Sequence, residues 1–295
     1  MMYRAIAALT GAVMLLSAGG PAAALSEDEE NRIVALLEHA VDASEGIEIG
    51  GATVTSAGGW AMQHDEACEF NRLLNGDHDA CSILAILVPP DEIGIDSIYY
   101  YSGEDVGHVD MEEWTGDARS EIDNLWDSYV AGTKEQGEIL GETIEPLRWV
   151  LYPTLNKERG IMTYGILISF DGDETINLIA IKFTRKGYAM MRIITKEQIL
   201  AESGADLDSV AAYASETYLP ATGLDYADFE VGDHVAEIGA LGVLAAAMGV
   251  NYTNKGWLTA IGAAILIFAK KAWVLLLVVP VALWAGFKKL FRRGS

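Results

Sequence analysis

The chain has 295 residues, of which 51% are hydrophobic, and it carries 43 Asp and Glu against 20 Lys and Arg. This length suffices for one large domain or two small ones, and a chain this apolar is not a mostly disordered one. A formal net charge of −23 argues against a general nucleic-acid binder, because affinity for phosphates needs a basic surface, and two cysteines are too few for a four-thiolate zinc site.

The N-terminal segment 1–24 has the pattern of a signal peptide. Arg4 supplies the positive charge of the n-region, an apolar stretch runs from Ala5 to Leu16, and Ala22 and Ala24 form an A-x-A cleavage site. A retained transmembrane anchor is the alternative, but the apolar stretch is shorter than the ~20 residues that span a bilayer. The sequence therefore predicts that the chain is exported.

Residues 25–230 are expected to form an acidic, extracytoplasmic domain. Their patterns predict helices at 25–44, 111–137 and, apart from Gly204, 196–218. They also predict a hairpin at 47–55, a polar loop at 68–81, and strands at 82–88, 95–102, 147–152, 161–170, 177–184 and 188–195. Asp171-Gly172-Asp173 is a turn between two of these strands, and Arg185-Lys186-Gly187 is a turn between the next two. Successive strands joined by tight turns, with helices before and after, predict an α+β fold with an antiparallel sheet and flanking helices.

Charge changes sign after this domain. All 43 acidic residues lie between Glu27 and Glu237, together with 12 Lys and Arg, whereas residues 238–295 hold seven Lys and Arg and no acidic residue. An acidic body and a basic, apolar tail are expected to face different solvents.

Residues 231–256 are expected to form a Gly/Ala-rich helix followed by a turn. Gly242 with Ala246, and Ala245 with Gly249, are pairs of small residues four apart, which allow helices to approach closely. Two interpretations stay open. The helix packs on the body or on the membrane surface, or it associates with a second copy to give a homo-oligomer.

Residues 257–295 are expected to comprise an interfacial segment, a transmembrane helix and a basic cytoplasmic tail. The apolar run 272–287 is bracketed by aromatic and basic residues of the kind that anchor a span at its two interfaces: Lys270, Lys271, Trp273, Trp284, Lys288 and Lys289. The predicted fold thus ends in C-terminal helices that include one transmembrane helix. The expected location is the bacterial inner membrane, crossed once, with the main domain periplasmic or extracellular and the bilayer as a partner.

Cys68 and Cys81 are expected to form a disulfide, which is the default for two cysteines in an exported body. A metal site is the alternative, because further metal-binding side chains lie close in sequence: His64, Asp65, Asp77, His78 and Asp79. This cluster lacks the paired C-x-x-C spacing of a zinc site. No motif assigns a catalytic, cofactor-binding or metal-binding residue.

Two stretches carry a resemblance to a known family. Tyr226-Ala227-Asp228-Phe229 precedes Asp233-x-Val235-Ala236-Glu237-x-Gly239, and Gly107-His108-Val109 precedes the acidic residues 110–113. These stretches, together with the order along the chain of an acidic body, a Gly/Ala helix and a basic end, resemble a bacterial family of uncharacterised membrane-anchored proteins. The family is known as domain of unknown function 2167. The chain departs from that family at its two cysteines. The strand-strand-strand-helix ending is similar in outline to PsbP-like folds, which implies no function.

The sequence favours a non-enzymatic binding or scaffold module of the bacterial envelope, with an envelope protein as partner and no nucleic acid. The first alternative is an exported hydrolase whose site involves His64, His78 and His108. The second is a self-associating membrane assembly protein built on the Gly/Ala helix.

Overall fold

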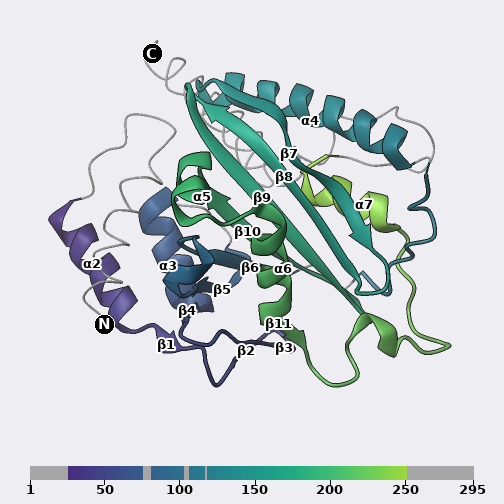
Figure 1. Cartoon of the computed structure of the whole chain (residues 1–295), viewed down its shortest axis with the longest axis horizontal. Coiled ribbons are helices and arrows are strands. Elements are labelled where there is room, and N and C mark those ends of the chain that lie inside the picture. The colour runs from purple at the N-terminus through teal and green to yellow at the C-terminus, as the bar shows by residue number, and fades with distance from the viewer. Residues whose placement is uncertain (1–25, 76–80, 103–105, 117, 251–295) are drawn as a thin grey trace, which may run out of the picture.

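The centre of the molecule is an eight-stranded antiparallel sheet with the strand order β1-β4-β5-β6-β10-β9-β8-β7 (Figure 1). A computed structural model describes residues 26–75, 81–102, 106–116 and 118–250. The strands are β1 (Val41–Asp42), β4 (Trp60–Gln63), β5 (Ile83–Val88), β6 (Ile98–Ser102), β7 (Ile144–Asn156), β8 (Ile161–Phe170), β9 (Asp173–Thr184) and β10 (Gly187–Thr195).

The four long strands follow one another in the chain as a meander. Asp171 and Gly172 connect β8 to β9 with φ angles of 50° and 92°, so the tight turn uses the left-handed region that Gly and Asp tolerate best. β10 alternates strictly between buried and half-buried residues, β8 is buried over most of its length, and β9 is buried mainly in its central part. This pattern means that helices cover both faces of the central strands.

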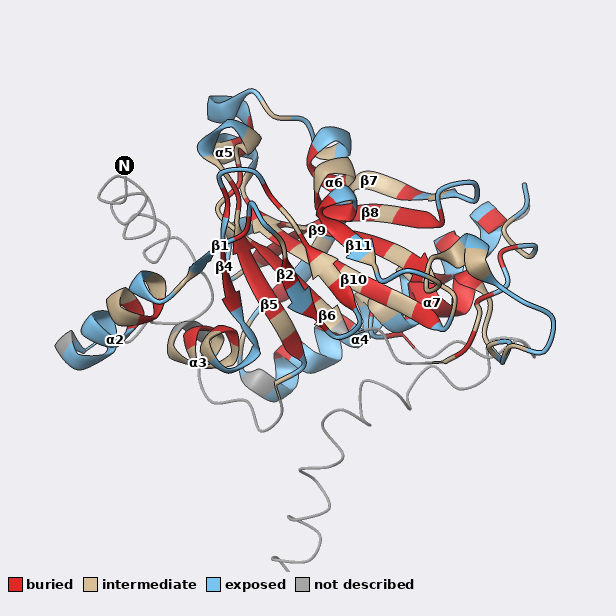
Figure 2. Ribbon diagram, turned by 90° about the horizontal axis from the view of Figure 1, so that it is seen from below, coloured by how far each residue is buried: buried red, intermediate tan, exposed pale blue. Residues whose placement is uncertain are grey.

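One face of the sheet is covered by two helices and a small second sheet. α5 (Glu197–Ser203) and α6 (Leu207–Thr217) lie on this side, as Figure 2 shows. The small sheet has the order β11-β3-β2, with β2 (Ile47–Ile49), β3 (Ala52–Val54) and β11 (Tyr218–Pro220). The helical stretch expected at 196–218 is interrupted at Gly204, as the sequence indicated, because this residue has a φ of 70° and ends α5.

The opposite face is covered by four helices in two groups. α2 (Glu27–Glu38) and α3 (His64–Asn75) pack over one end of the sheet, and α4 (Ala118–Leu140) and α7 (Ala240–Ala247) pack over the other. Two short 3-10 helices, η1 (Asp91–Ile93) and η2 (Tyr226–Asp228), lie in connecting segments. The α+β architecture with flanking helices is therefore as expected, but α3 occupies a stretch whose polar composition suggested a loop.

The expectation that the fold includes a transmembrane helix is wrong for the part of the chain that the structure describes. No helix there is both long enough and apolar enough to cross a bilayer. α4 has 23 residues but carries charges along its length, and α7 is apolar but has only eight residues. The span expected at 272–287 and its anchors, Lys270, Lys271, Trp273, Trp284, Lys288 and Lys289, lie outside the described residues.

The Gly/Ala-rich segment packs into the body. Leu241, Val243 and Leu244 of α7 are at most 3% exposed and belong to the same core as residues of α4 and of β8 and β9. Gly242 is buried on this helix, whereas Ala246 and Gly249 are exposed. Gly242 and Ala246 therefore lie in different environments.

Candidate functional site

Two stretches that are more than 110 residues apart in sequence meet at one end of the sheet. We call residues 106–113 the His108 segment and residues 224–239 the strap. His108 forms a parallel bridge with Val235, in which the His108 amide donates to the His234 carbonyl at 2.8 Å and the Ala236 amide donates to the His108 carbonyl at 2.9 Å. The two stretches singled out in the sequence are therefore one structural unit.

Gly107 allows this close approach. Its φ is 98°, which disfavours any residue with a Cβ atom, and a Cβ added there would lie 2.7 Å from the His234 carbonyl oxygen. The Gly107 amide donates to the Lys186 carbonyl at 2.8 Å, so the segment is also held to the turn before β10. The strap can lie against the body here only because this position has no side chain.

The imidazole of His108 lies between two aromatic rings of the strap. Its centroid is 4.3 Å from that of Tyr226 and 4.2 Å from that of Phe229, and both pairs are stacked. The Tyr226 hydroxyl donates to the Val109 carbonyl at 2.9 Å and fixes its own ring. Aromatic pairs of this kind contribute about 0.5–1.5 kcal/mol beyond the area they bury. His108 is thus the anchor on which the strap packs.

Burial lowers the pKa of His108, although the charges of Asp233 and Asp110 act in the opposite direction. His108 Nδ1 is buried and has no hydrogen-bond partner among the described residues. A proton on the ring would place a partly desolvated charge inside the aromatic stack, and the carboxylates of Asp233 and Asp110 offset this cost only in part. The neutral imidazole is therefore the form that the stack accommodates.

We expect the acid sensitivity of the fold to depend on His108. Because its folded pKa lies below the unfolded value of ~6.5, its contribution to stability is present above about pH 6.5 and is lost as the pH falls towards the folded pKa. The variant His108→Phe keeps an aromatic ring and removes this titration. Urea unfolding should show a smaller loss of stability between neutral and mildly acidic pH for this variant than for the wild type. Equal losses would contradict this role.

An ion pair fixes the other side of the strap. Arg185 donates to both carboxylate oxygens of Asp233, at 2.8 and 2.9 Å, and its guanidinium lies 3.2 Å from Glu230. Arg185 holds the pKa of the Asp233 carboxyl below its usual range, and the amide of Glu230 acts in the same direction. The Arg185 amide also donates to the Leu224 carbonyl at 2.9 Å, which joins the end of β9 to the start of the strap.

The strap runs directly into α7, and the His108 segment caps that helix. Leu241 donates its amide hydrogen to Glu113 Oε1 at 2.8 Å, and the Ala240 amide donates to the Asp110 carbonyl at 3.0 Å. A carboxylate at a helix N-terminus satisfies free amides and interacts favourably with the helix dipole. A side chain at Gly239 would collide with the Glu113 carboxylate. The acidic run 110–113 therefore has a structural role.

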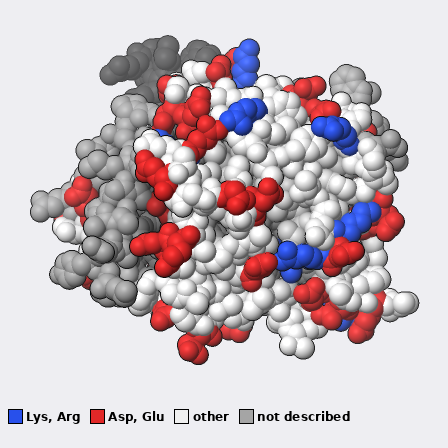
Figure 3. Space-filling model, in the orientation of Figure 1, with Lys and Arg blue, Asp and Glu red and all other residues white. Residues whose placement is uncertain are grey.

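The strap exposes apolar side chains, among them Phe229, whose ring also packs on His108. Val231 is 104% exposed, Val235 48% and Phe229 39%. The strap also carries five carboxylates: Asp225, Asp228, Glu230, Asp233 and Glu237. We call Phe229, Val231 and Val235 the apolar ridge. Acidic side chains are likewise spread over the face of the body shown in Figure 3, with fewer basic ones.

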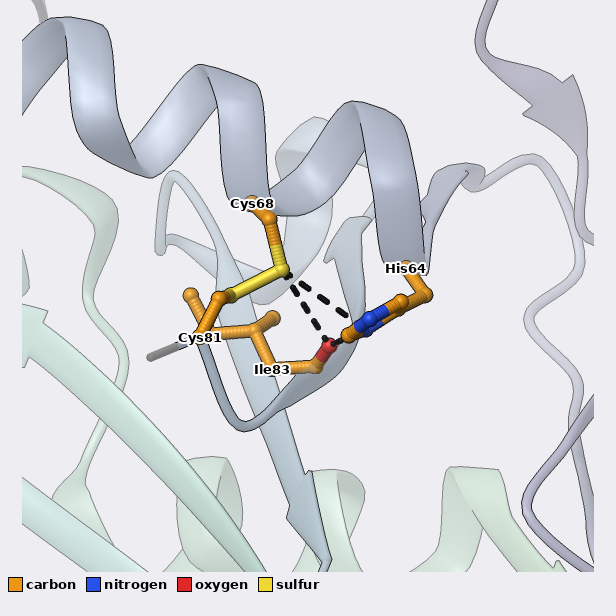
Figure 4. Close-up of a disulfide and its surroundings, with 4 residues drawn as sticks. All are labelled: His64, Cys68, Cys81 and Ile83. Atoms are coloured by element: carbon orange, nitrogen blue, oxygen red, sulfur yellow. Dashed lines mark hydrogen bonds between the residues drawn. A yellow bond between two sulfur atoms is a disulfide. The ribbon is translucent and has the colours of Figure 1, made fainter. Parts of the chain in front are cut away.

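Cys68 and Cys81, for which a disulfide was expected, are at disulfide distance, with 2.02 Å between their sulfur atoms. Cys68 lies on α3, and the bond ties this helix to Cys81, two residues before β5 (Figure 4). His64 Nδ1 lies 2.6 Å from the Ile83 carbonyl oxygen and 3.6 Å from Cys68 Sγ. Within the described ranges no three His, Cys, Asp or Glu side chains could hold a metal ion.

The structure gives His64 and His108 different neighbours, so it does not unite the histidines considered for a hydrolase. His64 contacts Cys68 and Ile83 next to α3, and His108 contacts Tyr226 and Phe229 in the strap. His78 lies outside the described residues, as do Asp77 and Asp79.

Comparison with known proteins gives a matching family and a similar solved structure. The model of a family described as "Protein of unknown function (DUF2167)" matches residues 53–281, a range that includes the His108 segment and the strap. No curated protein matches the chain. The solution structure of cyanobacterial PsbP (CyanoP) from Synechocystis sp. PCC 6803 is similar over 57% of this chain and 85% of that one, with 8% identity. Its TM-score of 0.33 is too low to support an inference.

Proposed function

The chain belongs to the DUF2167 family of proteins of unknown function, and we propose that it is an exported, non-enzymatic binding module of the bacterial envelope. The observation that carries this proposal is the apolar ridge on the strap. The stretches that resemble the family hold a surface loop in one conformation and leave Val231 fully exposed. Exposed apolar side chains on a rigidly held loop are typical of a protein-binding surface.

The charges around the ridge indicate what kind of partner fits. Glu230 and Glu237 are exposed beside the ridge, and Asp233 is paired with Arg185 behind it. An apolar ridge with carboxylates around it fits an apolar hollow with Lys and Arg at its rim, because opposite charges favour correct association. We therefore propose that the partner is an envelope protein with a basic-rimmed apolar site.

Two observations support export. The segment Met1–Ala24 has the three parts of a signal peptide, and the Cys68–Cys81 bond belongs in an oxidising compartment. The acidic body suits such a location, because its net charge keeps it soluble and disfavours association with anionic surfaces.

Val231→Glu should abolish partner capture and leave folding intact. The side chain makes no buried contact, so the free energy of unfolding should change by less than about 0.5 kcal/mol, whereas a carboxylate at the centre of an apolar contact opposes binding. The measurement is affinity capture from cross-linked membranes followed by mass spectrometry. Ile139→Glu is the matched control, because Ile139 is 78% exposed but lies on α4. A protein captured equally by both variants would not be the partner of the ridge.

A further inference from the structure

Arg192 lies near the middle of the sheet, where β10 runs between β6 and β9 (Figure 1). It is opposite Tyr99 on one neighbouring strand and Ile179 on the other, and directly opposite residues point to the same face. That face is the one covered by α3 and α4. Arg192 is half-buried there and is far in sequence from both the His108 segment and the strap.

The guanidinium of Arg192 has no carboxylate partner among the described residues. The ion pairs of that part of the chain use Arg32, Arg148, Arg159, Arg185 and Lys196. Arg192 instead lies over the ring of Tyr101, with its Cζ atom 5.4 Å from the ring centroid. In a chain with 43 acidic residues, a half-buried arginine that has no carboxylate partner in the described ranges is unusual.

Two buried polar atoms on this face lack hydrogen-bond partners. Arg192 Nε is buried and unpaired, and so is Asn177 Oδ1 on β9. Asn177 is opposite Ile194, so it lies diagonally across from Arg192 on the same face, within reach of a long side chain. Buried donors and acceptors in native proteins are almost always satisfied. A bound group that accepts a hydrogen bond from Arg192 Nε would satisfy the first atom, and Asn177 Oδ1, which is an acceptor, needs a donor such as a hydroxyl of the same group.

Tyrosine side chains surround this position. Burial raises the pKa of Tyr101, Tyr129 and Tyr164, and the positive charge of Arg192 opposes that rise for all three. Tyr129 comes from α4 and Tyr164 from β8, so the charge of Arg192 acts on tyrosines of different elements. At neutral pH these hydroxyls are protonated and can donate hydrogen bonds.

We propose that Arg192, with Asn177 and the neighbouring tyrosines, binds a small ligand through an oxyanionic group, a carboxylate or a phosphate. The guanidinium presents a planar pair of donors that matches two oxygens of such a group. The aromatic rings of Tyr101 and Tyr129 would contact the remainder of the ligand. This proposal is independent of the apolar ridge, because the two surfaces share no residue.

The test is isothermal titration of the full chain with two separate probes, inorganic phosphate and benzoate. At least one should bind with a dissociation constant below about 10 mM, and which of them binds distinguishes a phosphate site from a carboxylate site. Failure of both probes to bind would overturn the proposal and leave a bridging water as the partner of the two atoms.

Variants locate the binding. Arg192→Gln should weaken binding about tenfold or more, and Arg148→Gln, which changes an exposed arginine, should leave it within about twofold. Asn177→Asp places a carboxylate near Arg192 with almost no change in volume, so this variant should fold even if Arg192→Gln does not. The new negative charge should repel an oxyanionic ligand and weaken its binding about tenfold. Binding that is unchanged in Asn177→Asp would overturn the proposal.

Discussion

Gly107→Ala is expected to destabilise the protein by about 2–5 kcal/mol, because two effects add. The φ of 98° strains any residue with a Cβ atom, and the new methyl group would press against the His234 carbonyl oxygen, which cannot move without displacing the strap. Urea unfolding monitored by fluorescence measures the loss. If the strap detaches before the body unfolds, the same substitution should also weaken partner capture.

Gly172→Ala is the matched control. Gly172 has a nearly identical φ of 92°, but a Cβ added there meets nothing within 4 Å. Its substitution should therefore cost only the conformational strain, about 1–2 kcal/mol. The difference between the two variants isolates the close approach of the strap to Gly107. Equal costs would mean that the strap does not press on this position in solution.

Loss of the disulfide is the second large effect that we expect. The double variant Cys68→Ser, Cys81→Ser should lower the free energy of unfolding by about 3 kcal/mol, since the bond closes a loop with a sequence separation of 13 residues. The bond also ties α3 to the sheet, and α3 supplies Ala67 and Phe70 to the core that it shares with α2. The measurement is urea unfolding with and without a thiol reductant.

The reductant provides the control for this prediction. It should destabilise the wild type to the level of the double variant and have no effect on the double variant itself. A wild type that is insensitive to reductant while it reacts readily with a thiol reagent would show that the two cysteines are free. That result would also remove one of the two supports for export.

The sequence was a good guide to the long strands, and for a clear physical reason. β8, β9 and β10 are rich in β-branched residues and are separated by Gly-containing turns, so pattern and turn chemistry agree. α3 was missed because its polar residues were interpreted as a loop, although Phe70 and Ala67 lie on one face and are buried. Gly204 was noted in the sequence, but the break that it makes depends on its left-handed conformation.

The site could be predicted only in part. The motif containing Tyr226 and Phe229 and the one containing His108 were both visible in the sequence, but nothing local indicates that they meet. Their contact is a long-range bridge that depends on where β10 begins and where α6 ends. Arg185 was assigned to a turn, and its pairing with Asp233 depends on the same meeting of distant segments. The Gly/Ala helix shows the same limit, since an apolar stretch fits a protein core and a membrane equally well.

The most direct test of the account is photo-crosslinking in living cells from position 231, compared with position 139. Both side chains are exposed, but only Val231 belongs to the apolar ridge. We predict that a photoreactive residue at 231 captures one reproducible envelope protein, that position 139 does not, and that Gly107→Ala reduces the yield from 231. The same products from both positions, or none from 231, would contradict the proposal that the strap presents a binding surface.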